Sequence, residues 1–260
     1  MRDEIITSNL RKAFSLKLLY TADKNGLFSR IWYFDTNVLV DNELQPRCEA
    51  IIKNGNFRVS IDVLDELTRG KPSPHNPAWH RGRKLAEYIL EHHRDKILKK
   101  PSSKIISELR EVSQLTTKNY IYRKISGRLK QIYDLFQRND RSTLDNFIHI
   151  LNKDMSETLK RDFKKRAGGI IQHDKIGWIT DLFVQDLRKS LIRILHIIEH
   201  YSHYDFNTCK RILEETCFRP LDNDINIAAS YIMHRKPQHH LASNDKDVIE
   251  LIVLHECRAA

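Results

Sequence analysis

Four acidic residues lie in segments of the chain that are predicted to be strands and the helices next to them. They are Asp35, Glu66, Asp224 and Asp245. In an α/β protein, functional groups gather at the carboxyl ends of the strands. Carboxylates packed together repel one another and raise each other's pKa, which costs free energy unless a cation compensates their charge. Oxygen ligands without a nearby Cys or His suit Mg²⁺ or Mn²⁺. Such an ion lowers the pKa of a bound water and neutralises charge on a phosphoryl transition state, so these acids predict metal-assisted chemistry on a phosphate ester.

Three strands are predicted to position these acids. The first is residues 31–34, a short apolar run without helical spacing, and the other two are residues 57–60 and 240–243. Asp35 follows the first strand, and Glu66 lies one to two turns into the helix after the second. Asp224 begins the helix that leads into the third strand, and Asp245 comes soon after that strand. Strands that alternate with helices indicate a parallel sheet. The carboxyl ends of its strands meet at one edge, so the four acids are expected to converge there. A single Asp at such a place is better explained as a helix cap or turn former, but four at equivalent places favour a common site.

A long helical middle separates the two ends of this α/β chain. Between residues 104 and 215 the apolar residues recur three to four apart, with little Gly or Pro to interrupt them. At the N-terminus, residues 1–22 predict an amphipathic helix that closes in a turn at 23–26. We therefore expect an α/β fold with a parallel sheet, interrupted by a large all-helical insertion. The expected parts are an N-terminal helical segment at 1–30, an α/β domain at 31–115 and 216–260, and a basic helical insertion at 116–215.

The positive charge of the chain is concentrated in its middle. The formal net charge is +10. Residues 1–80 hold 11 basic and 10 acidic side chains, residues 216–260 hold 5 and 6, and residues 81–215 hold 28 and 18. The whole excess therefore lies in 81–215. Charge of this kind suits a surface that binds a polyanion, and a solvated basic helix face explains it about equally well.

Two groups of basic residues are the candidates for contacts with nucleic acid. The first is close in sequence to the Glu66 helix and comprises Arg81, Arg83 and Lys84. The second is the densest basic cluster of the chain and comprises Lys160, Arg161, Lys164, Lys165 and Arg166. Contacts of this kind with phosphates would make binding depend steeply on salt. Tyr120, Tyr122 and Trp178 offer faces for base stacking, although aromatic residues of a helical bundle are usually core.

Four segments resemble the motifs of PIN-domain nucleases, in the order that this family has them. They are FDTNVL at 34–39, VSIDVLDEL at 59–67, DINIAA at 224–229 and LASNDKD at 241–247. Each segment alone is unspecific, whereas the four together in order are fairly specific. The resemblance covers residues 31–100 and 216–260, which is under half of the chain. It departs from a minimal PIN domain in the spacing of Glu66 and Asp224, which lie 158 positions apart in the sequence.

The resemblance implies a three-layer α/β/α fold, a bound Mg²⁺ or Mn²⁺, and cleavage of phosphodiester bonds, most often in RNA, to leave a 5′-phosphate and a 3′-hydroxyl. The metal-binding and catalytic acids that it implies are Asp35, Glu66, Asp224 and Asp245. Asp247 would serve beside or instead of Asp245, and Asp222 is a weaker rival to Asp224. Asn37 and Ser243 fall where the family places polar residues that orient the acids or a water.

The leading hypothesis is therefore a metal-dependent endoribonuclease with RNA as its partner. One alternative is a non-catalytic module that binds nucleic acid or protein on the same scaffold. A less favoured one is a phosphohydrolase that resembles the haloacid dehalogenase superfamily, which needs a second acid where this chain has Asn37. The basic insertion could also dock an inhibitory or recruiting protein.

Other signals bear on the site and the compartment. His196, His200 and His203 share a helix face at a spacing that could hold zinc, but no further ligand completes the set, so an ordinary polar face is expected. The four cysteines lack any paired spacing, which predicts reduced thiols. No apolar run approaches the length of a membrane span and no secretory signal is visible, so we expect a cytoplasmic protein without a membrane partner.

Overall fold

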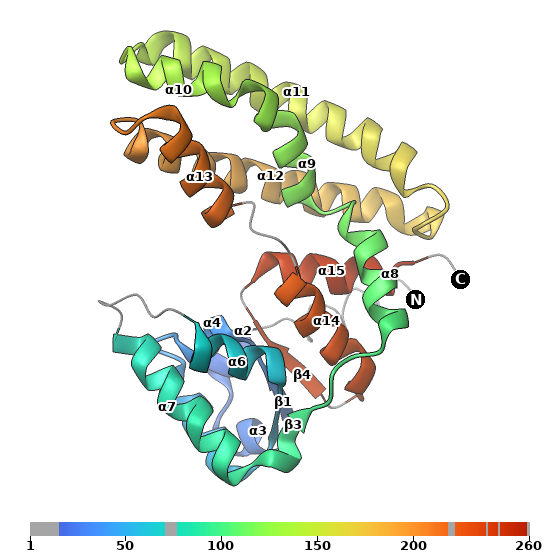
Figure 1. Ribbon diagram of the computed structural model, residues 1–260. Coiled ribbons are helices and arrows are strands. Elements are labelled where there is room, and N and C mark those ends of the chain that lie inside the picture. The colour runs from blue at the N-terminus through green and yellow to red at the C-terminus, as the bar shows by residue number, and fades with distance from the viewer. Residues whose placement is uncertain (1–15, 71–76, 218–221, 238, 244, 259–260) are drawn as a thin grey trace. The chain divides into compact units, whose positions relative to one another are not determined.

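The computed structural model describes residues 16–70, 77–217, 222–237, 239–243 and 245–258 (Figure 1). The chain divides into two compact units. Unit 1 comprises Met1–Leu109 with Asp222–Val253, and unit 2 comprises Arg110–Leu221 with Leu254–Ala260. Unit 2 thus extends a few residues beyond each end of the expected insertion, and it takes in the last residues of the chain.

Unit 1 is built on a four-stranded parallel sheet with the strand order β3-β2-β1-β4. The strands are β1 (Ile31–Phe34), β2 (Phe57–Ser60), β3 (Ile97–Leu98) and β4 (His239–Ala242). The predicted parallel sheet is confirmed, and so are the bounds of the first two strands. The prediction for β4 was one residue late, and β3 was missed because two residues carry no readable pattern.

Both faces of the central strand β1 are covered. Trp32, Tyr33 and Phe34 are all buried, and successive side chains of a strand point to opposite faces. The polar atoms of this strand are paired as well: the indole N–H of Trp32 donates to the carbonyl of Leu27 at 2.9 Å, and the hydroxyl of Tyr33 donates to that of His234 at 2.8 Å. Burial on both faces is what a parallel sheet inside an α/β domain requires.

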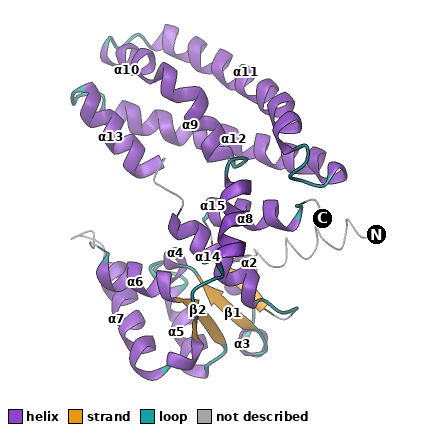
Figure 2. Ribbon diagram, turned by 45° about the vertical axis from the view of Figure 1, so that its right-hand side comes forward, coloured by secondary structure: helices purple, strands orange, loops and turns teal. Residues whose placement is uncertain are grey.

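The helices of unit 1 alternate with its strands along the chain, and Figure 2 shows them around the sheet. They are α2 (Leu16–Thr21), α3 (Lys24–Phe28), α4 (Thr36–Leu39), α5 (Gln45–Asn54), α6 (Ile61–Arg69), α7 (Pro77–His92), the 3₁₀ turn η1 (Arg94–Lys96) and α14 (Asp222–His234). Helices α8 (Ser103–Ser113) and α15 (Lys246–Glu256) each contain the boundary between the units.

Two short helices differ from the sequence prediction. The expected turn at 23–26 is wrong, because α3 starts at Lys24, and Asp23 caps it by accepting from the N–H of Gly26 at 2.7 Å. Helix α4 was not predicted, since a single turn shows no periodicity. Of the predicted helix over 1–22, residues 1–15 lie outside the described part of the chain and α2 covers most of the remainder.

Helix α6 shows how the sequence turns its acids away from the core. Ser60 caps the helix, and its hydroxyl accepts from the N–H of Val63 at 3.3 Å. Val63, Leu64 and Leu67 are buried on one face. Asp65 and Glu66 stand between Leu64 and Leu67 in the sequence and are less buried than these leucines.

Unit 2 is helical. Its elements are α9 (Thr117–Ile125), the 3₁₀ turn η2 (Ser126–Arg128), α10 (Leu129–Gln137), α11 (Arg141–Ala167), α12 (His173–Tyr201) and α13 (Phe206–Cys217). The two long helices α11 and α12 lie side by side (Figure 1), with Phe163 and Phe183 in edge-to-face contact at 5.4 Å between ring centroids. The hydroxyl of Tyr120 on α9 donates to the carbonyl of Met155 at 3.1 Å. The helical texture that the sequence predicted for this region is confirmed.

The four cysteines are free thiols, as their spacing predicted. Burial raises the pKa of Cys48 and of Cys209, and it raises the pKa of Cys257 to about 11. These three thiols therefore stay protonated near neutral pH, which makes them poor nucleophiles. Among the helices that the structure describes, none is long and apolar enough to cross a membrane.

Candidate active site

Asp35 lies at the carboxyl end of β1 and caps α4. One carboxylate oxygen, Oδ1, accepts from the backbone N–H of Thr36 at 2.6 Å. The other, Oδ2, accepts from the hydroxyl of Ser243 at 2.5 Å and from the side-chain amide of Asn37 at 3.0 Å. Asn37 and Ser243, the two residues that were expected to orient the acids, thus donate to the same oxygen of Asp35.

The carboxyl of Asp35 is unusually hard to ionise. It is 3% exposed, and this burial is the main reason why its pKa is raised to about 6. The hydrogen bonds from Ser243 and Thr36 lower the pKa, whereas the negative charges of Asp245 and Glu66 raise it further. These three predicted acids therefore lie close enough to act on one another electrostatically.

Thr36 connects Asp35 to Glu66. Its N–H donates to Asp35, while its hydroxyl donates to Oε2 of Glu66 at 2.9 Å. Glu66 is half-buried on α6, so a single residue at the start of α4 holds acids from two different elements. Sequence analysis missed Thr36, although its place directly after Asp35 was a usable signal.

Asp62 is a further carboxylate of this region that sequence analysis missed. It precedes Glu66 by four residues and so shares its face of α6. Its Oδ1 accepts from the side-chain amide of Asn226 on α14 at 3.2 Å. Its Oδ2 is buried and has no hydrogen-bond partner among the described residues. The four-residue spacing from Glu66 was the signal that could have identified it.

The predicted acids of α14 stand in its first turn. Asp224 is half-buried and its weaker rival Asp222 is exposed. The hydrogen bond between Asn226 and Asp62 holds this end of α14 to α6. Among the described groups that shift the pKa of Asp35, Asp245 and Glu66 are present and Asp224 is not. The structure thus brings the first turn of α14, which carries Asp224, to the acid-bearing helix α6.

Asp245 and Asp247 mark the start of α15. The N–H of Asp245 donates to the hydroxyl of Ser243 at 3.0 Å, so this serine binds to both Asp35 and the following loop. Oδ1 of Asp245 accepts from the N–H of Asp247 at 2.8 Å, which is the bond of a helix cap. Asp247 is half-buried in the first turn of the helix.

The donors at this edge of the sheet fit a divalent ion in their chemistry. Carboxylate oxygens are the ligands that Mg²⁺ and Mn²⁺ prefer. Burial is the main cause of the raised pKa of Asp35, and the negative charges of Asp245 and Glu66 beside it contribute to the rise. As the side chains stand, no group of three or more His, Cys, Asp or Glu residues within the described ranges is arranged to hold a metal. Asp35, Glu66 and Asp245 are the residues that could supply such a group.

The predicted basic residues of unit 1 have different surroundings. Arg81 donates from Nε to the side-chain oxygen of Gln45 at 2.6 Å and from Nη2 to that of Asn42. Arg83 forms an ion pair with Glu87 at 3.4 Å, one helical turn further on. Lys84 is exposed. Arg81 and Lys84 thus keep their charge for a ligand, whereas that of Arg83 is partly compensated.

The basic cluster of unit 2 occupies the end of α11. Lys160, Lys164 and Lys165 are exposed there, and Arg161 lies 3.7 Å from Asp162. Arg166 donates to the backbone carbonyl of Gln114 at 2.8 Å, and Arg123 of α9 donates to the same oxygen at 2.6 Å. Burial and the neighbouring charge of Arg123 lower the pKa of Arg166. Two guanidinium groups therefore meet at one carbonyl, which extends the predicted cluster to α9.

The aromatic candidates of unit 2 divide between core and surface. Tyr120 is 2% exposed and belongs to the core. Trp178 is half-buried on α12. Tyr122 is 39% exposed, so among these three it offers the most accessible ring for stacking.

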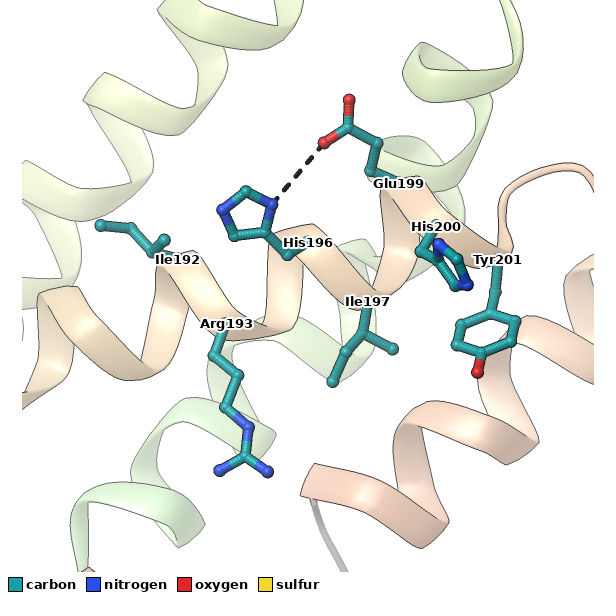
Figure 3. A pocket seen from close by; sticks show the side chains of 7 residues that line it. All are labelled: Ile192, Arg193, His196, Ile197, Glu199, His200 and Tyr201. Atoms are coloured by element: carbon teal, nitrogen blue, oxygen red, sulfur yellow. Dashed lines mark ion pairs between the residues drawn. The ribbon is translucent and has the colours of Figure 1, made fainter. Parts of the chain in front are cut away.

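The histidines of α12 lie along an open cavity of about 800 Å³ (Figure 3). Nδ1 of His196 lies 3.8 Å from Oε2 of Glu199, and His200 and Tyr201 pack ring to ring at 4.7 Å. Figure 3 shows these side chains leaving one helix in different directions. The expectation that His203 shares a helix face with the other two histidines is wrong, because α12 ends at Tyr201 and His203 lies in the turn that follows.

The site residues thus come from the ends of three strands and the helices that follow them. Comparisons of the chain with models of protein families, with curated proteins and with solved structures found no match.

Proposed function

We propose that this protein is a divalent-metal-dependent nuclease, an endoribonuclease that hydrolyses the phosphodiester bonds of RNA. The observation that carries the proposal is the buried carboxylate of Asp35 beside Glu66 and Asp245 at the carboxyl edge of a parallel sheet. Burial, and to a smaller extent the charges of Asp245 and Glu66, raise the pKa of Asp35, and a divalent ion bound beside these carboxylates would compensate their charge. The resemblance of four segments to PIN-domain nucleases supports the same function.

Two groups of residues would have different roles at this site: one would hold the metal ion and the other would orient the acids. Asp35, Glu66 and Asp245 would bind the ion, with Asp224 and Asp62 as further candidates. The ion supplies a more acidic water and neutralises charge on the phosphoryl group. Ser243, Asn37 and Thr36 fix the direction in which the acids present their oxygens.

The first test is cleavage of end-labelled single-stranded and structured RNA, and of matched DNA, with Mn²⁺, Mg²⁺ or EDTA. We expect the wild-type protein to cut RNA internally and EDTA to abolish the reaction. The double variant Asp35→Asn/Asp245→Asn should be slower by roughly 100-fold or more, because the metal's contribution of several kcal/mol is lost. Products with a 5′-phosphate and a 3′-hydroxyl would match the family that the chain resembles.

Helix α6 offers a matched pair of variants for this test. Glu66→Gln removes a carboxylate from the site, whereas Asp65→Asn removes one from the preceding position, where it forms an exposed ion pair with Arg69 at 3.4 Å. An exposed pair of this kind contributes about 0–1 kcal/mol to stability. We expect Glu66→Gln to lose cleavage and Asp65→Asn to keep it. Equal loss in both variants would contradict the assignment of Glu66.

A non-catalytic module that binds RNA is the second candidate. It is favoured by the observation that both oxygens of Asp35 already accept hydrogen bonds and that no three-ligand group is formed among the described residues. Salt-dependent binding of RNA by the wild-type protein, without cleavage in either metal, would support this candidate and overturn the nuclease.

A further inference from the structure

A groove between α5 and α7 collects three cations and one carboxylate in unit 1. Its volume is about 200 Å³, and the basic residues that line it are Lys53, Arg81 and Lys84. Glu49 is the acidic residue of the lining, and Ile52 and Leu85 form its apolar part. Figure 2 shows α5 and α7 next to each other at the side of the sheet. We call this feature the α5–α7 groove.

Arg81 is held in place by neutral groups. It donates to the side-chain oxygens of Gln45 and Asn42. Gln45 is itself 2% exposed and donates from Nε2 to the carbonyl of Leu39 at 3.0 Å. A guanidinium fixed by amide oxygens keeps its full positive charge and has further N–H groups to offer an anion.

The same contacts tie the groove to the candidate active site. Leu39 is the last residue of α4, and Asp35 is its N-cap. The helix has four residues, which correspond to roughly 6 Å of axis. The buried amide that anchors Arg81 is therefore bonded to the far end of the short helix that Asp35 caps.

The other cations of the groove are not engaged elsewhere. Within the described part of the chain, neither Lys53 nor Lys84 makes an ion pair or a side-chain hydrogen bond, and both are exposed. Three positive charges with one carboxylate among them attract an anion. At the groove, Tyr88 is 36% exposed and its ring stacks on that of His92 at 4.5 Å, with an angle of 21° between the planes. An exposed aromatic pair beside cations is the combination that holds single-stranded nucleic acid.

We propose that the α5–α7 groove binds the sugar-phosphate backbone of a single RNA strand, with Arg81, Lys84 and Lys53 on its phosphates and Tyr88 against one of its bases. The class of ligand rests on the proposed function, because RNA is the substrate proposed there. The groove would then guide the strand toward the edge of the sheet where Asp35 lies.

The test is binding of a fluorescent oligouridine of about 12 nucleotides, in the range of a single binding surface. Anisotropy is measured in EDTA at several salt concentrations, so no metal-dependent cleavage interferes. The groove variant is Lys53→Glu/Lys84→Glu. The control variant, Lys104→Glu/Lys236→Glu, reverses two exposed lysines of unit 1 that lie outside the lining. Circular dichroism melts check that both variants fold.

We expect the groove variant to bind at least about tenfold more weakly, and the slope of log K against log salt to fall by roughly 0.7 for each phosphate that the variant no longer neutralises. Tyr88→Leu should weaken binding without changing this slope, because stacking involves no counterion release. Equal affinity of the groove variant and the wild type, or equal weakening in the control, would overturn the proposal. Cleavage by the wild-type protein is measured separately. If the groove variant binds RNA more weakly but the wild type never cuts RNA, the groove proposal stands and the proposed nuclease function fails. If the wild type cuts RNA but the groove variant binds as tightly as the wild type, the nuclease function stands and the groove proposal fails.

Discussion

At the scale of single residues, Asp35 links the site to the stability of the fold. Its pKa rises from 3.8 to about 6 on folding, mainly because it is buried. The folded protein therefore binds this proton more tightly than the unfolded one, so the contribution to stability is full below about pH 4 and disappears as the pH passes about 6. We expect a loss on the order of 3 kcal/mol between these limits. Urea unfolding in EDTA across this range measures it.

The variant Asp35→Asn isolates this effect. An amide cannot ionise, so the variant should lack the pH-dependent loss, although it also disturbs the bonds that Ser243 and Asn37 donate. The difference in unfolding free energy between variant and wild type should therefore change with pH in favour of the variant. A constant difference would show that burial does not perturb Asp35. Mn²⁺ at neutral pH should stabilise the wild type and not the variant, since a ligand stabilises only the state that binds it.

At the scale of elements, a close approach between α7 and α4 supports the site. A Cβ atom added at Gly82 would lie 2.9 Å from Cγ1 of Val40 and 3.1 Å from the carbonyl of Leu39. Gly82→Ala should therefore destabilise the protein by about 1–3 kcal/mol through overpacking. Gly177→Ala on α12 meets nothing within 4 Å, and it should stabilise by about 0.5–1 kcal/mol because Ala favours the helix. Urea unfolding compares the two, and a neutral Gly82→Ala would contradict this packing.

The elements also show how far the sequence could predict the molecule. The strand at 31–34 was predicted because it is a compact apolar run, and the strand at 57–60 because it follows the turn at Asn54 and Gly55. The residues after both strands were then found at one edge of the sheet. Helix α4 escaped prediction because one turn has no period. Gln45 was missed for another reason: its role depends on a contact with Arg81, which is distant in sequence and meets it only in the folded chain.

At the scale of the whole molecule, the charge excess within residues 81–215 lies mostly in unit 2, where Lys164 and Lys165 are exposed. If this charge binds RNA, Lys164→Glu/Lys165→Glu should lower the slope of log K against log salt by about 1.4 for single strands. The rate of cleavage at saturating RNA should stay unchanged, because the acids of unit 1 are untouched. Arg128→Glu/Lys153→Glu is the control, as it changes two other exposed cations of the same unit. Anisotropy measures the salt dependence of binding, and single-turnover kinetics measure the cleavage rate. If the slope of log K against log salt is the same in the variant and the wild type, Lys164 and Lys165 are part of a solvated helix face and do not bind RNA.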